Sequence, residues 1–238
     1  MIRTIIFLLL FLVILIVAIP IGIVTRLVEG KDKFAPLPRI CNGIIRYIIY
    51  PMVCLAGAKH TIIGKENLPD GPALFVANHQ GNFDAMFVLY AFDRIPVIIA
   101  KKETEKLPIV HMWMTIIHCI FMDRGNVRAG LQSIKDAAEY LEHGFSVAIF
   151  PEGTRSQGPN MGEFKSGAFK AAVKAKVPVV PVAIDGSYKM MEEKKHLAKA
   201  DIKISILKPI EIDGTEKTQE LAEQAQALVQ AELDRLRA

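Results

Sequence analysis

Residues 5–24 read IIFLLLFLVILIVAIPIGIV, a run of twenty positions without a charged side chain. As a helix, such a run extends about 30 Å, which matches the thickness of the hydrocarbon core of a bilayer. A cleaved signal peptide has a shorter apolar core and a small-residue cleavage site. The run therefore predicts a retained helical membrane anchor, which Pro20 would kink.

Basic residues gather beside this apolar segment. Residues 1–60 hold seven Lys and Arg and two acids, whereas the remainder of the chain holds 22 basic and 23 acidic residues. This distribution suits anionic membrane headgroups, although flanking charge without a lipid role stays open, and no basic stripe for nucleic acid is present. Because Arg3 alone precedes the run and several basic residues follow it, the charge bias places the globular domain on the cytoplasmic face of the inner membrane.

A second apolar stretch covers residues 40–58 and is interrupted by Arg46 and Pro51. It is compatible with a segment that returns through the membrane or lies in its interface, and equally with a core helix of the soluble domain. We therefore divide the chain into N-terminal membrane-anchoring helices, residues 1–58, and an α/β domain, residues 59–238.

From His60 onward, short apolar runs alternate with helical patterns, of which the clearest are residues 83–93 and 127–141. Continuous apolar runs of this kind are typical of strands buried on both faces. The predicted strands are residues 73–77, 96–100, 119–122, 147–150, 179–184 and 202–207. This alternation predicts an α/β fold in which helices flank a largely parallel or mixed sheet.

The first predicted strand is followed at once by Asn-His-Gln-Gly-Asn-Phe-Asp, residues 78–84. His79 and Asp84 would not share a face of a regular helix, but they can meet if His79 lies in a turn and Asp84 in the first helical turn after it. Gly81 and Asn82 permit such a turn. A carboxylate bound to one imidazole nitrogen leaves the other free to accept a proton, which predicts a general base. The alternative is a surface histidine and a helix-capping aspartate.

A second polar segment, Phe-Pro-Glu-Gly-Thr-Arg-Ser at residues 150–156, follows another predicted strand. Loops at strand ends are where α/β folds place their sites. Gly153 allows close backbone approach to a ligand, Arg155 carries a planar fork suited to phosphate, and Thr154 adds a hydroxyl. The alternative is an exposed polar turn.

A third group is basic and consists of Lys101, Lys102 and Arg124, which follow two further predicted strands, with Lys165 as a fourth candidate. If these strands are neighbours, the charges gather with Arg155 at one rim; otherwise they are scattered solvated charges. The cysteines form no CxxC pair and lie at no metal-ligand spacing from a histidine, so the sequence predicts free thiols, no metal and no cofactor.

Together these segments resemble the glycerolipid acyltransferase family, and within it the bacterial members that make phosphatidic acid. The family's NHxxxxD block matches Asn78, His79 and Asp84, and its FPEGTRS block matches residues 150–156 without a change. A block that ends in arginine matches residues 121–124, and a Val/Pro-rich strand matches residues 177–182. One departure is His111, which stands where the family commonly has glycine three residues after a proline.

The resemblance implies that His79, oriented by Asp84, is the general base for the free hydroxyl of lysophosphatidic acid. That hydroxyl would attack the thioester of acyl-CoA or acyl-carrier protein. Phosphate-holding residues would be Lys101, Arg124 and Arg155, and the segment Glu152, Gly153, Thr154 would shape the pocket. The implied partners also include membrane lipids. The resemblance implies neither a cofactor nor a nucleic-acid partner. Two alternatives stay open: an acyltransferase acting on glycerol-3-phosphate or another lyso-lipid, and a non-catalytic membrane lipid-binding protein.

Overall fold

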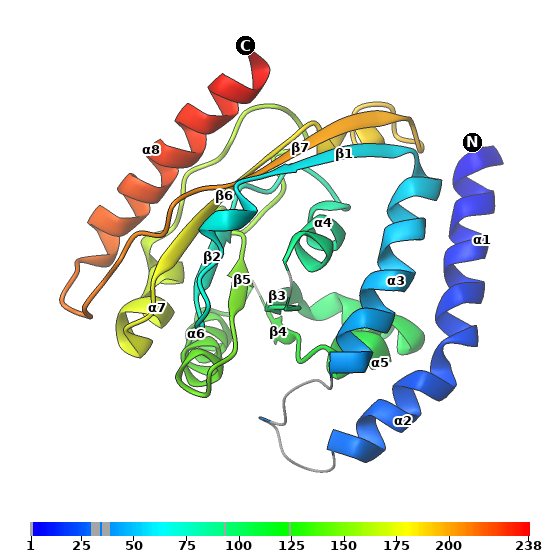
Figure 1. Cartoon of the computed structure of the whole chain (residues 1–238), viewed down its shortest axis with the longest axis horizontal. Coiled ribbons are helices and arrows are strands. Elements are labelled where there is room, and N and C mark those ends of the chain that lie inside the picture. Colours follow the sequence, from blue (N-terminus) through cyan, green and yellow to red (C-terminus); the bar gives the residue numbers. More distant parts are fainter. Residues whose placement is uncertain (1, 30–33, 35–38, 93, 124) are drawn as a thin grey trace.

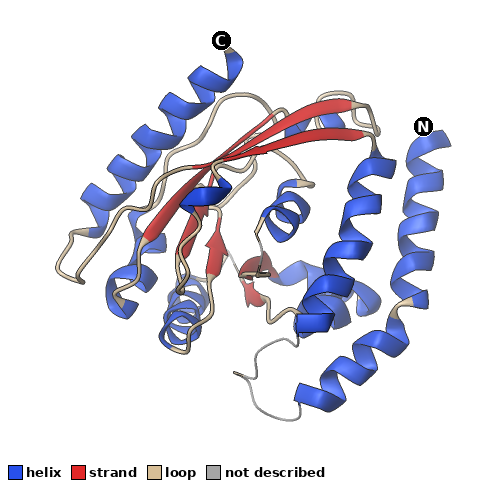
Figure 2. Cartoon of the chain, viewed as in Figure 1, coloured by secondary structure: helices blue, strands red, loops and turns tan. Residues whose placement is uncertain are grey.

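The computed structural model describes residues 2–29, 34, 39–92, 94–123 and 125–238 of the chain. Within these residues, helices pack on both faces of a seven-stranded sheet (Figures 1 and 2). The strands are β1 Ala58–Ile63, β2 Leu74–Ala77, β3 Val97–Lys101, β4 Ile120–Met122, β5 Val147–Ile149, β6 Val179–Asp185 and β7 Ala200–Ile206. The α-helices are α1 Ile2–Val17, α2 Ile19–Glu29, α3 Arg39–Ala56, α4 Asp84–Ala91, α5 Pro108–Ile116, α6 Val127–Glu142, α7 Lys170–Ala175 and α8 Thr218–Arg237. The short 3₁₀ helices are η1 Lys65–Asn67, η2 Lys102–Lys106, η3 Ser166–Phe169 and η4 Ser187–Met190.

The strands lie in the order β1-β7-β6-β2-β5-β3-β4. Neighbouring strands run parallel except for β6 and β7, which are antiparallel. The mixed α/β architecture predicted from the sequence is therefore confirmed. Because β2, β3, β4, β5 and β6 run in one direction, the loops that follow them meet at one edge of the sheet.

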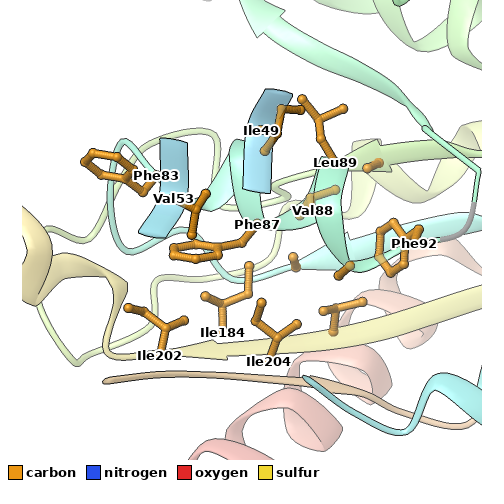
Figure 3. Close-up of a cluster of buried hydrophobic side chains, with 14 of the residues drawn as sticks. Ile49, Val53, Phe83, Phe87, Val88, Leu89, Phe92, Ile184, Ile202 and Ile204 are labelled. Carbon is orange, nitrogen blue, oxygen red and sulfur yellow. The ribbon is translucent and has the colours of Figure 1, made fainter. Parts of the chain in front are cut away.

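The strands are buried on both faces. In β2, Phe75 and Ala77 join the core beneath α3 and α4, whereas Leu74 and Val76 join the core beneath α6, α7 and α8. This alternation follows from the two-residue period of a strand. Figure 3 shows part of the first core, where Val53 of α3 and Phe87 of α4 pack over the sheet.

The predicted strands overlap β2 to β7, whereas β1 was not predicted. This strand pairs with β7 alone at the edge of the sheet. Its residues alternate between exposed (Lys59 and Thr61) and partly buried (His60 and Ile62). A search for continuous apolar runs finds strands covered on both faces and overlooks an edge strand of this kind.

The apolar run at residues 5–24 forms two helices instead of one, since α1 ends at Val17 and α2 begins at Ile19. Figure 1 shows the chain changing direction between them. Pro20 lacks the amide hydrogen that would bond to the carbonyl of Ile16, four residues earlier, which explains the break. Of the helices within the described residues, none combines the length and the apolar character needed to cross a membrane.

The second apolar stretch, residues 40–58, forms α3 and the start of β1. One face of α3 buries Met52, Val53 and Ala56 in the core shared with the sheet. Other side chains of the same helix are open to solvent, with Tyr47 81% and Leu55 50% exposed. The helix therefore packs against the α/β domain and also presents apolar side chains outward.

Candidate active site

The two polar segments singled out in the sequence meet at the edge where β2 and β5 end. Asn78, the first residue after β2, donates from Nδ2 to the carbonyl of Ile184 (2.9 Å) and accepts at Oδ1 from the amide of the same residue (2.7 Å). The buried side chain thus continues the pairing between β2 and β6 after the backbone has turned away. This contact fixes where the next residue, His79, leaves the sheet.

His79 and Asp84 are in direct contact. The imidazole Nδ1 lies 2.8 Å from the Oδ2 atom of Asp84, and the two side chains are 12% and 0% exposed. The contact forms because His79 lies in the turn after β2 and Asp84 is the first residue of α4. A carboxylate can only accept, so Nδ1 carries the hydrogen and Nε2 is left as the ring nitrogen with a free lone pair.

The same oxygen of Asp84 also binds the turn. The amides of Gln80 and Gly81 donate to Oδ2 at 2.6 and 2.8 Å. These amides precede the helix, so the carboxylate closes the turn rather than capping α4. Charge-assisted bonds of this kind stabilise the carboxylate and hold the turn that carries His79.

Glu152, in the second segment, binds backbone rather than facing the cavity. Its Oε1 accepts from the amide of His79 (2.7 Å), and its Oε2 accepts from the amide of Gly162 (2.8 Å). Glu152 is 4% exposed, and burial raises the pKa of its carboxyl group above the usual range, against the opposing effect of the two amide donors. Glu152 therefore ties the second segment to the residue that bears the imidazole.

Further contacts join the same two segments. The ring of Phe150 stacks on the imidazole of His79 with centroids 4.1 Å apart. The amide of Ser156 donates to the carbonyl of His79 (2.8 Å), and the amide of Gln157 donates to that of Gln80 (3.1 Å). The imidazole is thus held by a carboxylate at one nitrogen and by an aromatic ring at one face.

A cavity of about 640 Å³ opens beside His79. Most of its wall is apolar and comes from α1, α3, α4, β3 and α5, with Phe11, Ile49, Met86 and Trp113 among the lining residues. Its polar lining comes from the residues His79, Asn82, Lys101, Thr104, Thr154 and Arg155. The cavity can therefore hold a hydrocarbon chain with a polar group near the imidazole.

The cationic candidates are placed differently. Arg155 lines the cavity and donates from Nη1 to Oδ1 of Asn82, and its side chain is 38% exposed. Lys101 also lines the cavity, and its ammonium lies 3.0 Å from Glu103. Arg124 lies outside the described residues.

The two remaining lysines face other partners. Lys102 approaches Asp123 at 3.9 Å, a distance at the limit of an ion pair. The ammonium of Lys165 lies close to Gly153, because a Cβ built at that position would be 2.9 Å from Nζ. The positive φ of Gly153, 71°, further explains why glycine occupies the turn. Phe150, Thr154 and Arg155 of the second segment line the cavity, and of these three Thr154 is classed as exposed.

Two contributors were missed in the sequence analysis. Gln80 is buried beside His79, and Glu192 binds the backbone and side chain of Asn82. Glu192 lies in the turn after η4, outside every motif, so only the folded chain brings it to the site. Gln80 lies within the first motif, but glutamine is usually exposed, so its near-complete burial was not predicted from the sequence.

Cys119 lines the cavity but is poorly suited to act as a nucleophile. Burial raises the pKa of its thiol to about 12. A thiol reacts as its thiolate, so this side chain stays protonated and unreactive near neutral pH. Among the described residues that line the cavity, His79 is the side chain best placed to accept a proton.

Comparisons with known proteins agree on one class of enzyme. A family model described as Acyltransferase matches residues 59–185. The chain is similar to a probable 1-acyl-sn-glycerol-3-phosphate acyltransferase of Mycoplasma pneumoniae, with 34% identity over 203 residues, 82% of this chain and 76% of that protein. A chloroplastic 1-acyl-sn-glycerol-3-phosphate acyltransferase of Arabidopsis thaliana is 36% identical over 166 residues, 68% of this chain and 45% of that longer protein.

A solved structure extends the likeness to the whole fold. The crystal structure of the 1-acyl-sn-glycerophosphate (LPA) acyltransferase from Thermotoga maritima has a TM-score of 0.81 against this chain at 26% sequence identity. The alignment covers 100% of this chain and 97% of that one. The likeness therefore includes the N-terminal helices as well as the sheet.

Proposed function

The chain belongs to the acyltransferase family, and on that premise we propose that it moves a fatty acyl group from a thioester to the sn-2 hydroxyl of 1-acyl-glycerol-3-phosphate. The product would be phosphatidic acid, an intermediate of phospholipid biosynthesis. The observation that carries the proposal is the His79–Asp84 pair at the mouth of an apolar cavity whose rim bears Arg155.

The chemistry follows from the free nitrogen of the imidazole. Nε2 of His79 accepts the proton of the acceptor's hydroxyl as its oxygen bonds to the thioester carbonyl carbon. The tetrahedral intermediate then breaks its carbon–sulfur bond, and the leaving thiolate takes the proton back from the imidazolium. Asp84 stabilises the charged ring throughout, and no acyl group is attached to the protein.

The lining of the cavity supports a placement for the two ends of the proposed lipid substrates. A hydrocarbon chain gains free energy when it leaves water for the apolar wall, while the phosphate stays near the guanidinium of Arg155 and the ammonium of Lys101 at the rim. Arg124 is proposed to join them on the strength of the sequence motif. Glu152, by contrast, is proposed to hold the backbone of His79, since its oxygens are both occupied by amides.

We also propose that the N-terminal helices dock on the cytoplasmic face of the inner membrane. One face of α1 packs inward through Phe7, Phe11 and Ile14. The opposite face exposes a stripe of aliphatic side chains at helical spacing, namely Ile5 55%, Leu9 59%, Leu12 44%, Val13 52% and Ile16 45% exposed. A large exposed apolar stripe is a membrane or protein contact, and both proposed lipid substrates reside in a bilayer.

The proposal is tested by product identification. The purified protein would be incubated with lysophosphatidic acid in mixed micelles, with acyl-CoA in one reaction and acyl-carrier protein in another, and the lipids analysed by mass spectrometry. Formation of phosphatidic acid with either donor supports the proposal and identifies the donor. A preference for glycerol-3-phosphate or a phosphate-free lyso-lipid contradicts the proposed acceptor, and lipid binding without turnover with either donor contradicts the transfer reaction.

A further inference from the structure

Glu192 lies outside the sequence motifs but contacts Asn82, which lines the cavity. It follows η4, and the amides of Glu192 and Glu193 both donate to the carbonyl of Tyr188 (3.0 and 3.1 Å), which fixes the turn. The side chain of Glu192 is 4% exposed although it belongs to a surface turn. A carboxylate is seldom buried at this level without a specific partner.

That partner is Asn82, in the turn between His79 and Asp84. The Oε1 atom of Glu192 accepts from the backbone amide of Asn82 and from its Nδ2, both at 2.8 Å. The Oε2 atom packs against Gly81, where an added Cβ would lie 2.6 Å from it. Residue 81 must therefore lack a side chain for the carboxylate to reach its neighbour.

The contact determines which way the amide of Asn82 faces. A carboxylate only accepts and a guanidinium only donates, so Nδ2 must point to Glu192 and Oδ1 to Arg155. This is the arrangement observed, with Nη1 of Arg155 donating to Oδ1 and lying 3.7 Å from the carboxylate itself. The partly exposed ion pair at that distance adds little, so the hydrogen bonds carry the contact.

We propose that Glu192 is a positioning residue that holds Arg155, through Asn82, in place for the phosphate of the acceptor. The inference rests on the proposed function, because it extends the role given there to Arg155. Glu192 touches neither the imidazole nor the cavity, as far as the described residues show. Its effect should therefore fall on the recognition of phosphate rather than on proton transfer.

The test compares lysophosphatidic acid with 1-acylglycerol, which has the same chain and no phosphate. In Glu192→Ala, the preference for the phosphate-bearing acceptor, as a ratio of kcat/KM values, should fall about tenfold, within the range of coupled neighbours. The loss should lie in KM for the acceptor, and KM for the thioester should not change. Adding Glu192→Ala to Arg155→Ala should cause no further loss of the preference for the phosphate-bearing acceptor.

Matched variants separate positioning from general damage. Glu193→Ala removes an adjacent exposed carboxylate and should keep the full preference. Glu192→Gln retains an acceptor oxygen for Asn82 and should restore most of it, and Asn82→Ala should reproduce the loss even if Glu192→Ala does not fold. An equal fall in kcat/KM for both acceptors in Glu192→Ala and Asn82→Ala would overturn the proposal.

A measurement without turnover distinguishes this inference from the proposed function. Phenylglyoxal, which modifies guanidinium groups, should label Arg155 faster in Glu192→Ala and Asn82→Ala than in the wild type or Glu193→Ala, as read by peptide mass spectrometry. Unchanged labelling overturns the positioning role whatever the acceptor. If the two variants are labelled faster but the wild type shows no preference for the phosphate-bearing acceptor, the contact from Glu192 to Arg155 is supported. The phosphate role of Arg155 is then refuted instead.

Discussion

The Oδ2 atom of Asp84 lies 2.8 Å from Nδ1 of His79 and receives two backbone amides at the same time. One oxygen thus sets both the tautomer of the imidazole and the shape of the turn that carries it. The other oxygen, Oδ1, is buried and has no hydrogen-bond partner within the described part of the chain. The whole interaction therefore depends on the charge and orientation of a single carboxylate.

Replacing Asp84 by Asn should lower kcat by roughly 10²–10⁴, the range of a lost general base. An amide that keeps its oxygen toward His79 would place its NH₂ group where Oδ1 is buried without a partner, and it would lose the charge that stabilises the imidazolium. Steady-state kinetics with a thermal unfolding scan checks this. An Asp84→Asn protein with normal kcat would exclude the carboxylate from the reaction.

Glu152→Gln should lower the free energy of unfolding by about 1–3 kcal/mol at pH 4–5, since an NH₂ group would face one of the amides of His79 and Gly162. The raised pKa of Glu152 gives this loss a pH dependence. The folded protein holds the proton of Glu152 more tightly than the unfolded chain does. The contribution of the protonated carboxyl group to the free energy of unfolding is therefore fully present below the ordinary glutamate pKa of about 4.3, and it is lost as pH rises through the raised pKa of the folded state.

The check is urea denaturation of the wild type and Glu152→Gln across that range of pH. The stability difference between them should shrink as pH rises. A difference that grows with pH would mean that the folded-state pKa of Glu152 is lowered rather than raised.

Cys119→Ala should keep kcat within about a factor of two, because a buried thiol packs as a small apolar side chain and stays protonated. The companion measurement is a search for protein-bound acyl groups after a brief exposure to radiolabelled thioester donor. Label released by neutral hydroxylamine in the wild type and absent from Cys119→Ala would reveal a covalent route.

Replacing Leu9 and Val13 of α1 by Asp should reduce binding to anionic vesicles at least tenfold, because each exposed aliphatic side chain contributes roughly 1.5–3 kcal/mol when buried in lipid. Leu228→Asp is the matched control: this leucine is 40% exposed on α8, at the far side of the sheet from α1 (Figure 1). Vesicle co-sedimentation measures the effect. Equal binding by the double variant and Leu228→Asp would refute docking through α1.

The sequence contained enough to predict the sheet and the turn that brings His79 to Asp84. Buried strands are recognisable as apolar runs, and Gly81 and Asn82 permit the turn between His79 and Asp84. The edge strand β1 was missed because its exposure alternates. The apolar run was predicted as one helix kinked by Pro20; it forms two helices, α1 and α2, because Pro20 lacks the amide hydrogen of a regular helix.

Longer-range contacts could not be predicted in the same way. Glu152 could be identified from its motif, but its direction toward two amides depends on how β2 and β5 are placed side by side. Glu192 reaches Asn82 across 110 positions of sequence, and no spacing rule connects a carboxylate to a turn at that separation. Such contacts follow from the topology of the sheet.

The most direct test of the account is acyl transfer by His79→Ala, measured as phosphatidic acid formed from lysophosphatidic acid and the preferred thioester, alongside Glu193→Ala as a control for handling. Loss of the imidazole should reduce kcat by at least about 10², with the fold intact by circular dichroism. Turnover at the wild-type rate by a folded His79→Ala protein would show that the proton is removed elsewhere and would contradict the mechanism.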